Sequence, residues 1–387
     1  MKKHICFIVQ EYFPKDPRVR KYVNLLLENC YSVDVISLKR FDLPCYENYK
    51  NLEIYRIGLP KKRASLYRYF IEYLFFFFSS FVLVTKLYIK KKYSIIHINT
   101  LPDFLVFSTI IPKFFGAKIL LDMHEIAPEF FQMKFNKTEN HLIIRLLKSI
   151  EKVSLVYCDF AITVTKAIRE IFIKRAINEK KIDVIMNVPI ISGNNLKKKI
   201  NYKKRFNIVY HGTITDLYSL ENAVDAVSLI KNKISHIKFH IFGEGPSESR
   251  LKKRVNEKAL RKYVIFHGYV KSDQMNKELE KMDVGMLPMK RNIFIDLSFS
   301  NKLAEYVNLG ISVLTTRIPA VQDYFSDDSL FYSDDKPYDI EKTLFQIYSN
   351  ENIAREKLLN SYKEYKKINW EIMSARYLAI IQQLEKE

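Results

Sequence analysis

Apolar runs alternate with helical patterns along almost the whole chain, and no other feature restricts the fold as much. The run HICFIVQ is followed by the helical stretch PRVRKYVNLLLEN and then by a second run, SVDVISL. YSIIHIN, PDFLVFSTIIPKFFG and AKILLDM repeat the same order. Strands without polar alternation are typical of sheets buried on both faces, and strands joined by helices form parallel sheets. The sequence therefore predicts doubly wound α/β domains.

The alternation pauses once, in a polar and basic stretch that carries Pro189, Gly193 and two adjacent asparagines. It restarts with FNIVYHG and continues through IKFHIFGEG, YVIFHGYV and DVGMLPM. The final stretch has helical periodicity with apolar residues on one side, so we expect it to pack back toward the first domain. At 387 residues the chain is long enough for two domains. We expect an N-terminal domain at 1–188, a linker at 189–204, a C-terminal domain at 205–368 and a terminal helix at 369–387.

Charge and cysteine content restrict the class of partner. The net charge is +20, and the four cysteines have no paired spacing. Scattered cysteines argue against a disulfide framework and against a zinc site, and they fit a reducing compartment. The positive charge suits nucleic acid, an anionic membrane or phosphorylated substrates. Because no nucleic-acid-binding motif is present, we expect no nucleic-acid partner.

The aromatic stretch YFIEYLFFFFSSFVLVTKLYIKKK, at residues 69–92, leaves three structures open. Its uncharged core, from Tyr73 to Thr85, is shorter than the ~20 residues of a membrane-spanning helix. A helix buried in the protein is the first alternative, and a true membrane span is the last. Between them stands an interfacial helix, whose aromatic face enters a membrane surface while Lys86 and Lys90–Lys92 contact anionic headgroups.

The stretch SFSNKLAEYVNLG, at residues 298–310, predicts a short helix that begins at Ser300 or Asn301 and ends at Gly310. Lys302 and Glu305 share a face of its first turns, and an exposed ion pair would explain them. A nucleotide-diphosphate site explains them as well, because helix starts attract phosphate. The helix also opens at the carboxyl edge of the second sheet, where ligands bind in open parallel sheets.

The ordered motifs of the second half closely resemble the donor-binding domain of retaining glycosyltransferase family 4. These motifs are YHGTITDLYSLENAV, FHIFGEGPSESRL, VIFHGYVKSDQM, VGMLPMK and SNKLAEYVNLGISVLTT. EYFPKDPRVRKYVNLLL, YSIIHINTLPDFLVF and KILLDMHEIAPEFF are similar to that family's acceptor half. The resemblance implies a GT-B fold, with two Rossmann-like domains facing an interdomain cleft. It also implies a nucleotide-diphosphate sugar as donor, with UDP or GDP undetermined, and no metal or cofactor.

The resemblance implies a role for individual residues. Lys302 would contact the diphosphate, Glu305 would hold the ribose, and His124 would lie near the reacting sugar; these three are the predicted catalytic residues. Asp16 and Arg18 would line the acceptor side of the cleft. The predicted donor-binding residues are Gly212, Thr213, Gly243, Gly245, Tyr269, Val270, Lys290, Arg291, Asn301, Lys302 and Glu305.

Two departures from the family pattern concern charge at the donor site. Leu217 stands where a basic residue is expected, and Leu297 stands at the first glutamate of the E-x7-E motif, with Asp296 one residue away. We expect Lys290 or Arg291 to supply the missing positive charge from a neighbouring loop. The alternative is that both are solvated surface charges.

Structural roles compete with the functional ones in the first half. Asp16 and Pro17 are typical of a helix start, with Asp16 as N-cap and Pro17 at the first helical position. His124 follows a predicted strand end, where a histidine is often only a structural hydrogen-bonding group. Asp122 would orient His124 or cap a turn.

Three functions remain open on the sequence. The leading one is a retaining glycosyltransferase that moves a hexose to a lipid-linked or polysaccharide acceptor. The others are a nucleotide-sugar epimerase of the same fold and an inactive partner or binding subunit, which Leu217 and Leu297 favour. MKKHICFIVQ meets charged residues too soon for a signal peptide. We therefore expect a cytoplasmic protein bound peripherally to the inner face of the cell membrane.

Overall fold

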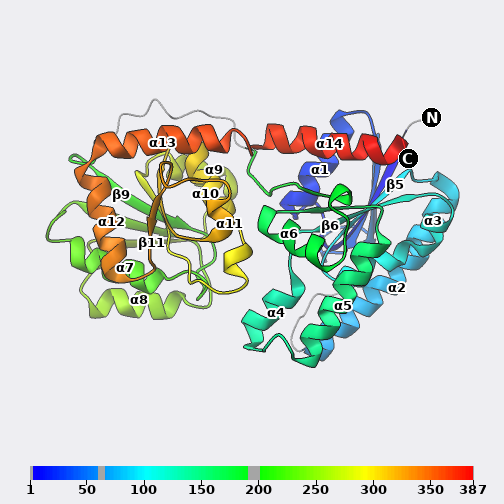
Figure 1. Ribbon diagram of the computed structural model, residues 1–387, viewed down its shortest axis with the longest axis horizontal. Coiled ribbons are helices and arrows are strands. Elements are labelled where there is room, and N and C mark those ends of the chain that lie inside the picture. The colour runs from blue at the N-terminus through cyan, green and yellow to red at the C-terminus, as the bar shows by residue number, and fades with distance from the viewer. Residues whose placement is uncertain (1–2, 60–65, 191–200, 387) are drawn as a thin grey trace. The chain divides into compact units, whose positions relative to one another are not determined.

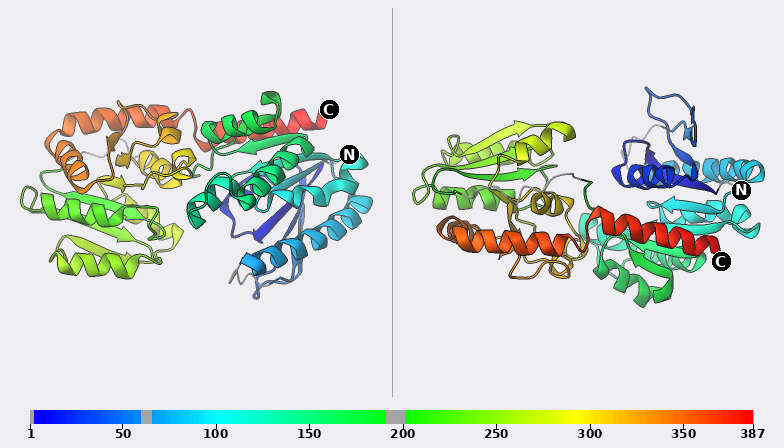
Figure 2. Two further views of the ribbon diagram at one scale, coloured as in Figure 1. Left: turned by 60° about the horizontal axis from the view of Figure 1, so that its bottom comes forward. Right: turned by 90° about the horizontal axis from the view of Figure 1, so that it is seen from above.

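The computed structural model describes residues 3–59, 66–190 and 201–386, and its chain forms two compact units. The first unit comprises Met1–Asn187 together with Met373–Glu387, and the second comprises Val188–Ile372. Most of the expected linker, residues 191–200, lies outside the described residues. Figures 1 and 2 show that each unit is a central sheet with helices on both faces. The predicted doubly wound α/β architecture is confirmed.

The first unit is built on an eight-stranded sheet with the order β3-β4-β2-β1-β5-β6-β7-β8. All neighbouring strands are parallel except the edge pair β3 and β4. Every residue of β5 is buried, as the unbroken apolar run predicts. The strands are β1 (His4–Tyr12), β2 (Ser32–Leu38), β3 (Tyr46–Tyr49), β4 (Leu52–Ile57), β5 (Ile95–Asn99), β6 (Lys118–Met123), β7 (Phe160–Thr163) and β8 (Ile182–Val184).

Helix α1 (Pro17–Glu28) begins as its sequence predicts. The Asp16 side chain accepts hydrogen bonds from the amides of Arg18 and Val19, and Pro17 opens the first turn. Proline loses nothing there because the first amides of a helix have no helical partner. The other helices of this unit are α2 (Leu66–Lys91), η1 (Asp103–Thr109), α3 (Ile110–Phe114), α4 (Ala127–Phe135), α5 (Leu142–Tyr157), α6 (Lys166–Arg175) and η2 (Glu179–Lys181).

Helix α2 differs from the wholly buried helix that was the first alternative for this stretch. One face packs on the unit, where the Gln10 side chain donates to the Glu72 carbonyl and Lys91 pairs with Asp34 and Glu53. By length and composition its segment Phe70–Lys91 is sufficient to cross a membrane, although the uncharged core seen in the sequence was too short. Only 28% of the most apolar part of this segment is buried. The opposite face is therefore apolar and exposed.

The second unit is built on a six-stranded parallel sheet with the order β11-β10-β9-β12-β13-β14. The chain leaves the sheet at the carboxyl ends of these strands through glycine- and proline-bearing loops, so the loops gather at one edge. The strands are β9 (Phe206–His211), β10 (Ile237–Phe242), β11 (Val264–Gly268), β12 (Val284–Leu287), β13 (Ser312–Thr316) and β14 (Phe331–Ser333).

Helix α10 (Asn301–Asn308) matches the predicted helix, with Ser300 as N-cap and Gly310 just beyond the end at φ 71. It packs against α13 and the sheet, whereas α7 packs against α12. The other helices are α7 (Leu220–Ile230), α8 (Glu248–Glu257), α9 (Ser272–Leu279), η4 (Ile295–Leu297), α11 (Pro319–Gln322), α12 (Pro337–Ser349) and α13 (Glu351–Tyr365).

The last helix, α14 (Trp370–Lys386), belongs to the first unit from Met373 onward. The ring of Tyr377 stacks on that of Tyr22, with centroids 4.3 Å apart. Its hydroxyl also hydrogen-bonds Nδ1 of the buried His97 at 3.0 Å. These contacts fix the helix to α1 and β5.

Candidate functional site

Two glycine loops follow neighbouring strands of the second unit and press against each other. Gly212 follows β9 with φ +118, and Gly243 follows β10 with φ +121. A Cβ on Gly243 would lie 2.1 Å from the Gly212 carbonyl oxygen, and a Cβ on Gly245 would lie 2.3 Å from that of Ile214. Only glycine combines these φ values with so close a backbone approach.

Lys302 extends over the first of these glycines. A Cβ on Gly212 would lie 2.4 Å from the Lys302 Cε and 3.0 Å from its Nζ. Nζ donates a 2.8 Å hydrogen bond to the Tyr218 hydroxyl and lies 4.5 Å from the centre of that ring. Within the described ranges no carboxylate pairs with Lys302. Its charge is therefore held in place by aromatic groups and is left for an anionic ligand.

Backbone amides add to this positive region. Ser300 gives no side-chain bond to the first turn of α10, and the amides of Asn301 and Lys302 have no partner among the described residues. The amide of exposed Thr213 also has none there, whereas the Gly212 amide donates to the Phe242 carbonyl at 2.9 Å. Free amides at a helix start favour phosphate. Thr213, and not Gly212, can therefore donate to a phosphate.

Glu305 lies one turn deeper in α10 and already has a protein partner. Its Oε2 is 2.6 Å from Nε2 of His211, whose Nδ1 is 2.9 Å from the Tyr306 hydroxyl. The Glu305 side chain is 27% exposed, so a ligand can still reach the carboxylate. Its predicted contact with a ribose stays a prediction.

The loop with Leu217 lies beside the loop with the two candidate cations. The Lys290 amide donates to the Leu217 carbonyl at 3.0 Å, and Tyr218 forms a β-bridge with Met289. Lys290 is exposed, and no carboxylate pairs with it in the described part of the chain. Arg291 instead makes two 2.9 Å bonds to Asp296. The backbone thus brings an unpaired lysine next to the position where the family pattern expects a cation.

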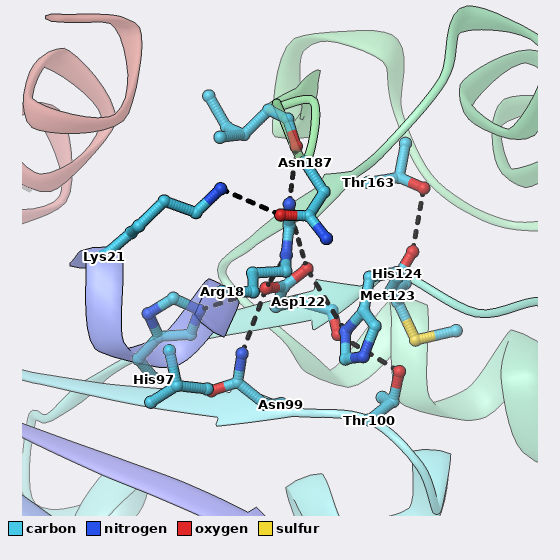
Figure 3. A network of polar contacts seen from close by, with 12 residues as sticks. Arg18, Lys21, His97, Asn99, Thr100, Asp122, Met123, His124, Thr163 and Asn187 are labelled. Atoms are coloured by element: carbon cyan, nitrogen blue, oxygen red, sulfur yellow. Dashed lines mark hydrogen bonds and ion pairs between the residues drawn. The ribbon is translucent and has the colours of Figure 1, made fainter. Parts of the chain in front are cut away.

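Asp122, at the end of β6, is the centre of a buried polar network in the first unit (Figure 3). The Arg18 guanidinium donates to both of its carboxylate oxygens, at 2.7 and 2.9 Å, and the Asn99 amide donates to one of them at 3.0 Å. The third guanidinium nitrogen donates to the Ile185 carbonyl at 2.8 Å. Burial raises the pKa of Asp122, but Arg18 and His124 together outweigh burial through their charges and hydrogen bonds and hold that pKa well below its usual value.

His124 stands at the mouth of this network. Its Nδ1 is 3.7 Å from Oδ1 of Asp122, and its side chain is 22% exposed. Burial alone would lower the pKa of His124, yet the Asp122 carboxylate outweighs burial and leaves it raised. The ring can therefore carry a proton near neutral pH and donate it, or a hydrogen bond, to an oxygen of a ligand.

Family models match the chain in the order of its two units. The model described as Glycosyltransferase Family 4 matches residues 18–188, and the model described as Glycosyl transferases group 1 matches residues 205–350. The chain belongs to glycosyltransferase family 4.

One relative with a named activity is also a glycosyltransferase by name. The chain is 24% identical over 277 residues to the chitobiosyldiphosphodolichol beta-mannosyltransferase of Debaryomyces hansenii, a match that covers 64% of this chain and 58% of that protein. The match thus spans little more than half of the relative's length.

Two solved structures share the fold over almost the whole chain. Sucrose-phosphate synthase from Thermosynechococcus elongatus has a TM-score of 0.75 at 16% identity and covers 99% of both chains. The Anabaena HepE protein in complex with UDP has a TM-score of 0.72 at 12% identity and covers 99% of this chain and all of that one. At such identities the likeness shows the fold alone, and this is the predicted GT-B fold.

The structure gives Arg18 a different role from the one that the family 4 pattern implied. Arg18 was expected to line the acceptor side, but it is 4% exposed and every guanidinium nitrogen is bonded within the unit. Asp16 caps α1, and an acceptor contact of that residue stays a prediction. Tyr269 is 73% exposed and Val270 is half-buried after β11, and their contact with the base likewise stays a prediction.

Three partners of these residues were given no role in the sequence analysis. Tyr218 and His211 hold Lys302 and Glu305, and Asn99 holds Asp122. Tyr218 lies in the same motif as Gly212, so its place near the site was readable, but its bond to Lys302 spans 84 residues. No cluster of three or more metal-binding side chains occurs among the described residues, and metal independence stays a prediction.

Proposed function

We propose that this member of family 4 transfers a sugar, with retention, from a nucleotide-diphosphate sugar to a lipid-linked or polysaccharide acceptor. The observation that carries the proposal is the unpaired Lys302, which lies against Gly212 beside the open amides of α10 and Thr213. A diphosphate leaving group carries the negative charge that such a site stabilises.

Donor binding in this proposal uses only side chains and amides. Lys302 and Lys290 supply charge, the start of α10 and the Thr213 amide supply hydrogen bonds, and Glu305 accepts from the ribose diol. The group that leaves in sugar transfer is the nucleotide diphosphate. Positive groups that are already in place stabilise this charge without rearrangement, and so they lower the barrier.

His124 would act on the sugar in this scheme. Its raised pKa favours a protonated ring that donates hydrogen bonds to sugar oxygens, which suits a retaining enzyme. An inverting enzyme needs a general base to take the acceptor proton, and a neutral His124 beside Asp122 could serve as that base. The relative from Debaryomyces hansenii is named a beta-mannosyltransferase, and a β-product from an α-donor requires inversion.

One experiment separates these reactions. The protein is incubated with UDP- and GDP-sugars, with and without a lipid-diphosphate-linked glycan, and released UDP or GDP is measured. We expect acceptor-dependent release from one donor, and NMR of the product should show the anomeric configuration of that donor. An inverted product would overturn retention. A new nucleotide sugar formed without acceptor would indicate an epimerase, and nucleotide binding without turnover would indicate a binding subunit.

The two candidate cations after β12 give a sharper prediction. We expect Lys290→Ala to weaken UDP or GDP binding by roughly three- to tenfold, a typical loss for one partly exposed charged contact. Arg291→Ala should have little effect, because Asp296 already neutralises that arginine. Isothermal titration of both variants tests this difference, and equal affinities for the two would remove Lys290 from the site.

A further inference from the structure

The outer face of α2 is apolar along most of its length. Ile71, Phe75, Phe78 and Val82 follow one another at intervals of three or four residues, and each is at least 39% exposed. This spacing places them on one stripe of the helix. A helix on the surface of a soluble protein has polar residues on its outer side, and this stripe of α2 has apolar residues there instead.

Helix α2 is joined to α5 through η1, and it also contacts α3. Phe104 of η1 packs edge-on against Tyr73 and Phe77 of α2, and Phe107 of η1 packs against Tyr157 of α5. Helix α3 continues from η1, and η1 contacts both α2 and α5 (Figure 1). The exposed apolar residues are Ile110, Phe114 and Phe115 near α3, and Leu142, Leu146, Val153 and Val156 on α5.

The exposed charges described on α2, η1, α3 and α5 have one sign. The carboxylates of these elements, Glu72, Asp103 and Glu151, are all buried. The exposed charged residues described on α2, η1, α3 and α5 are cations, namely Lys86, Lys90, Arg145 and Lys152. We call these exposed apolar and cationic residues the α2–α5 face.

We propose that the α2–α5 face docks onto the surface of an anionic lipid bilayer. Aromatic and aliphatic side chains would enter the boundary between headgroups and acyl chains, and the cations would contact lipid phosphates. No carboxylate described on these four elements is exposed, and this favours an anionic partner over a neutral apolar protein surface. This inference is independent of the proposed sugar transfer.

The contacts of α2 favour docking over insertion across the bilayer. Lys91 at its C-terminal end pairs with Asp34 and Glu53, and the Tyr88 hydroxyl donates to the Phe115 carbonyl. The inner face, with Phe76 and Val84 fully buried, belongs to the core of the first unit. A spanning α2 would have to break these contacts.

Vesicle sedimentation tests the proposal on the full chain. Vesicles of pure phosphatidylcholine are compared with vesicles that contain phosphatidylglycerol in addition, at low and high salt. We expect binding to the anionic vesicles at low salt, with strong weakening at high salt, because salt screens charges near the surface. Equal binding to neutral vesicles, or release by detergent alone, would overturn peripheral docking.

Matched variants assign the binding to the α2–α5 face. Lys86→Ala with Lys90→Ala should weaken binding by roughly tenfold or more, since each basic residue near an anionic surface contributes severalfold. Phe75→Ser with Phe78→Ser should weaken it on anionic vesicles at both salt levels. Leu229→Ser and the exposed-lysine pair Lys253→Ala with Lys262→Ala, all in the second unit, are controls and should bind like the wild type.

Self-association is the competing use of an apolar face. Light scattering on a size-exclusion column measures the mass of the wild type and of the Phe75→Ser with Phe78→Ser variant. The proposal would be overturned if the wild type were a dimer that binds no vesicles and the variant were a monomer. UDP and GDP binding should be unchanged in the face variants, so a failure here is distinct from a failure of the proposed function.

Discussion

Replacing Lys302 by alanine is expected to weaken UDP or GDP binding by roughly ten- to a hundredfold, the usual loss for one charged phosphate contact. The fold should survive, because Lys302 bonds to a tyrosine hydroxyl and no described carboxylate loses its partner. Isothermal titration gives the affinity, and urea unfolding gives the stability.

Tyr218→Phe is the control for this prediction. It removes the hydrogen bond that orients Lys302 but keeps the ring and the charge. We expect a loss of no more than severalfold. If Tyr218→Phe and Lys302→Ala weaken nucleotide binding equally, or if Lys302→Ala keeps full affinity, Lys302 does not contact the diphosphate.

Replacing Arg18 by leucine is expected to destabilise the first unit by about 3–5 kcal/mol, the cost of leaving a buried charge without its partner. Asp122 is fully buried, and Arg18 donates to both of its oxygens. Arg18→Leu combined with Asp122→Asn should recover much of the loss, because neither charge is then buried alone. Urea unfolding of the single and double variants measures both effects.

The pH dependence of stability should change sign in Arg18→Leu. In the wild type the folded-state pKa of Asp122 is depressed. Its ion pair therefore stabilises the fold above the unfolded pKa of about 3.9 and is lost as the pH falls toward the folded value. Without Arg18, burial raises that pKa, and the variant should lose stability as the pH rises above about 4. A variant that follows the wild-type pH profile would show that Arg18 does not control Asp122.

Local sequence patterns were sufficient for the order of elements and for several of their ends. Unbroken apolar runs predicted the parallel strands of both sheets, because a strand covered by helices on both faces has no polar side. Asp16 and Pro17 predicted the start of α1, and Gly310 predicted the end of α10, because capping depends on neighbours in the chain. The motifs also placed Gly212, Gly243 and Lys302 at one edge of the second sheet.

Partners that are distant in the chain were decided only by the tertiary structure. Arg18 and Asp122 are 104 residues apart in the chain, so no local pattern showed that Arg18 forms a buried ion pair. Asp296 neutralises Arg291 and leaves Lys290 unpaired among the described residues, a difference that depends on how one loop folds. The composition of α2 allowed it to be buried, interfacial or spanning. One face of α2 is buried because it packs on β1, and the other apolar face stays exposed because a sheet can cover only one side of a helix.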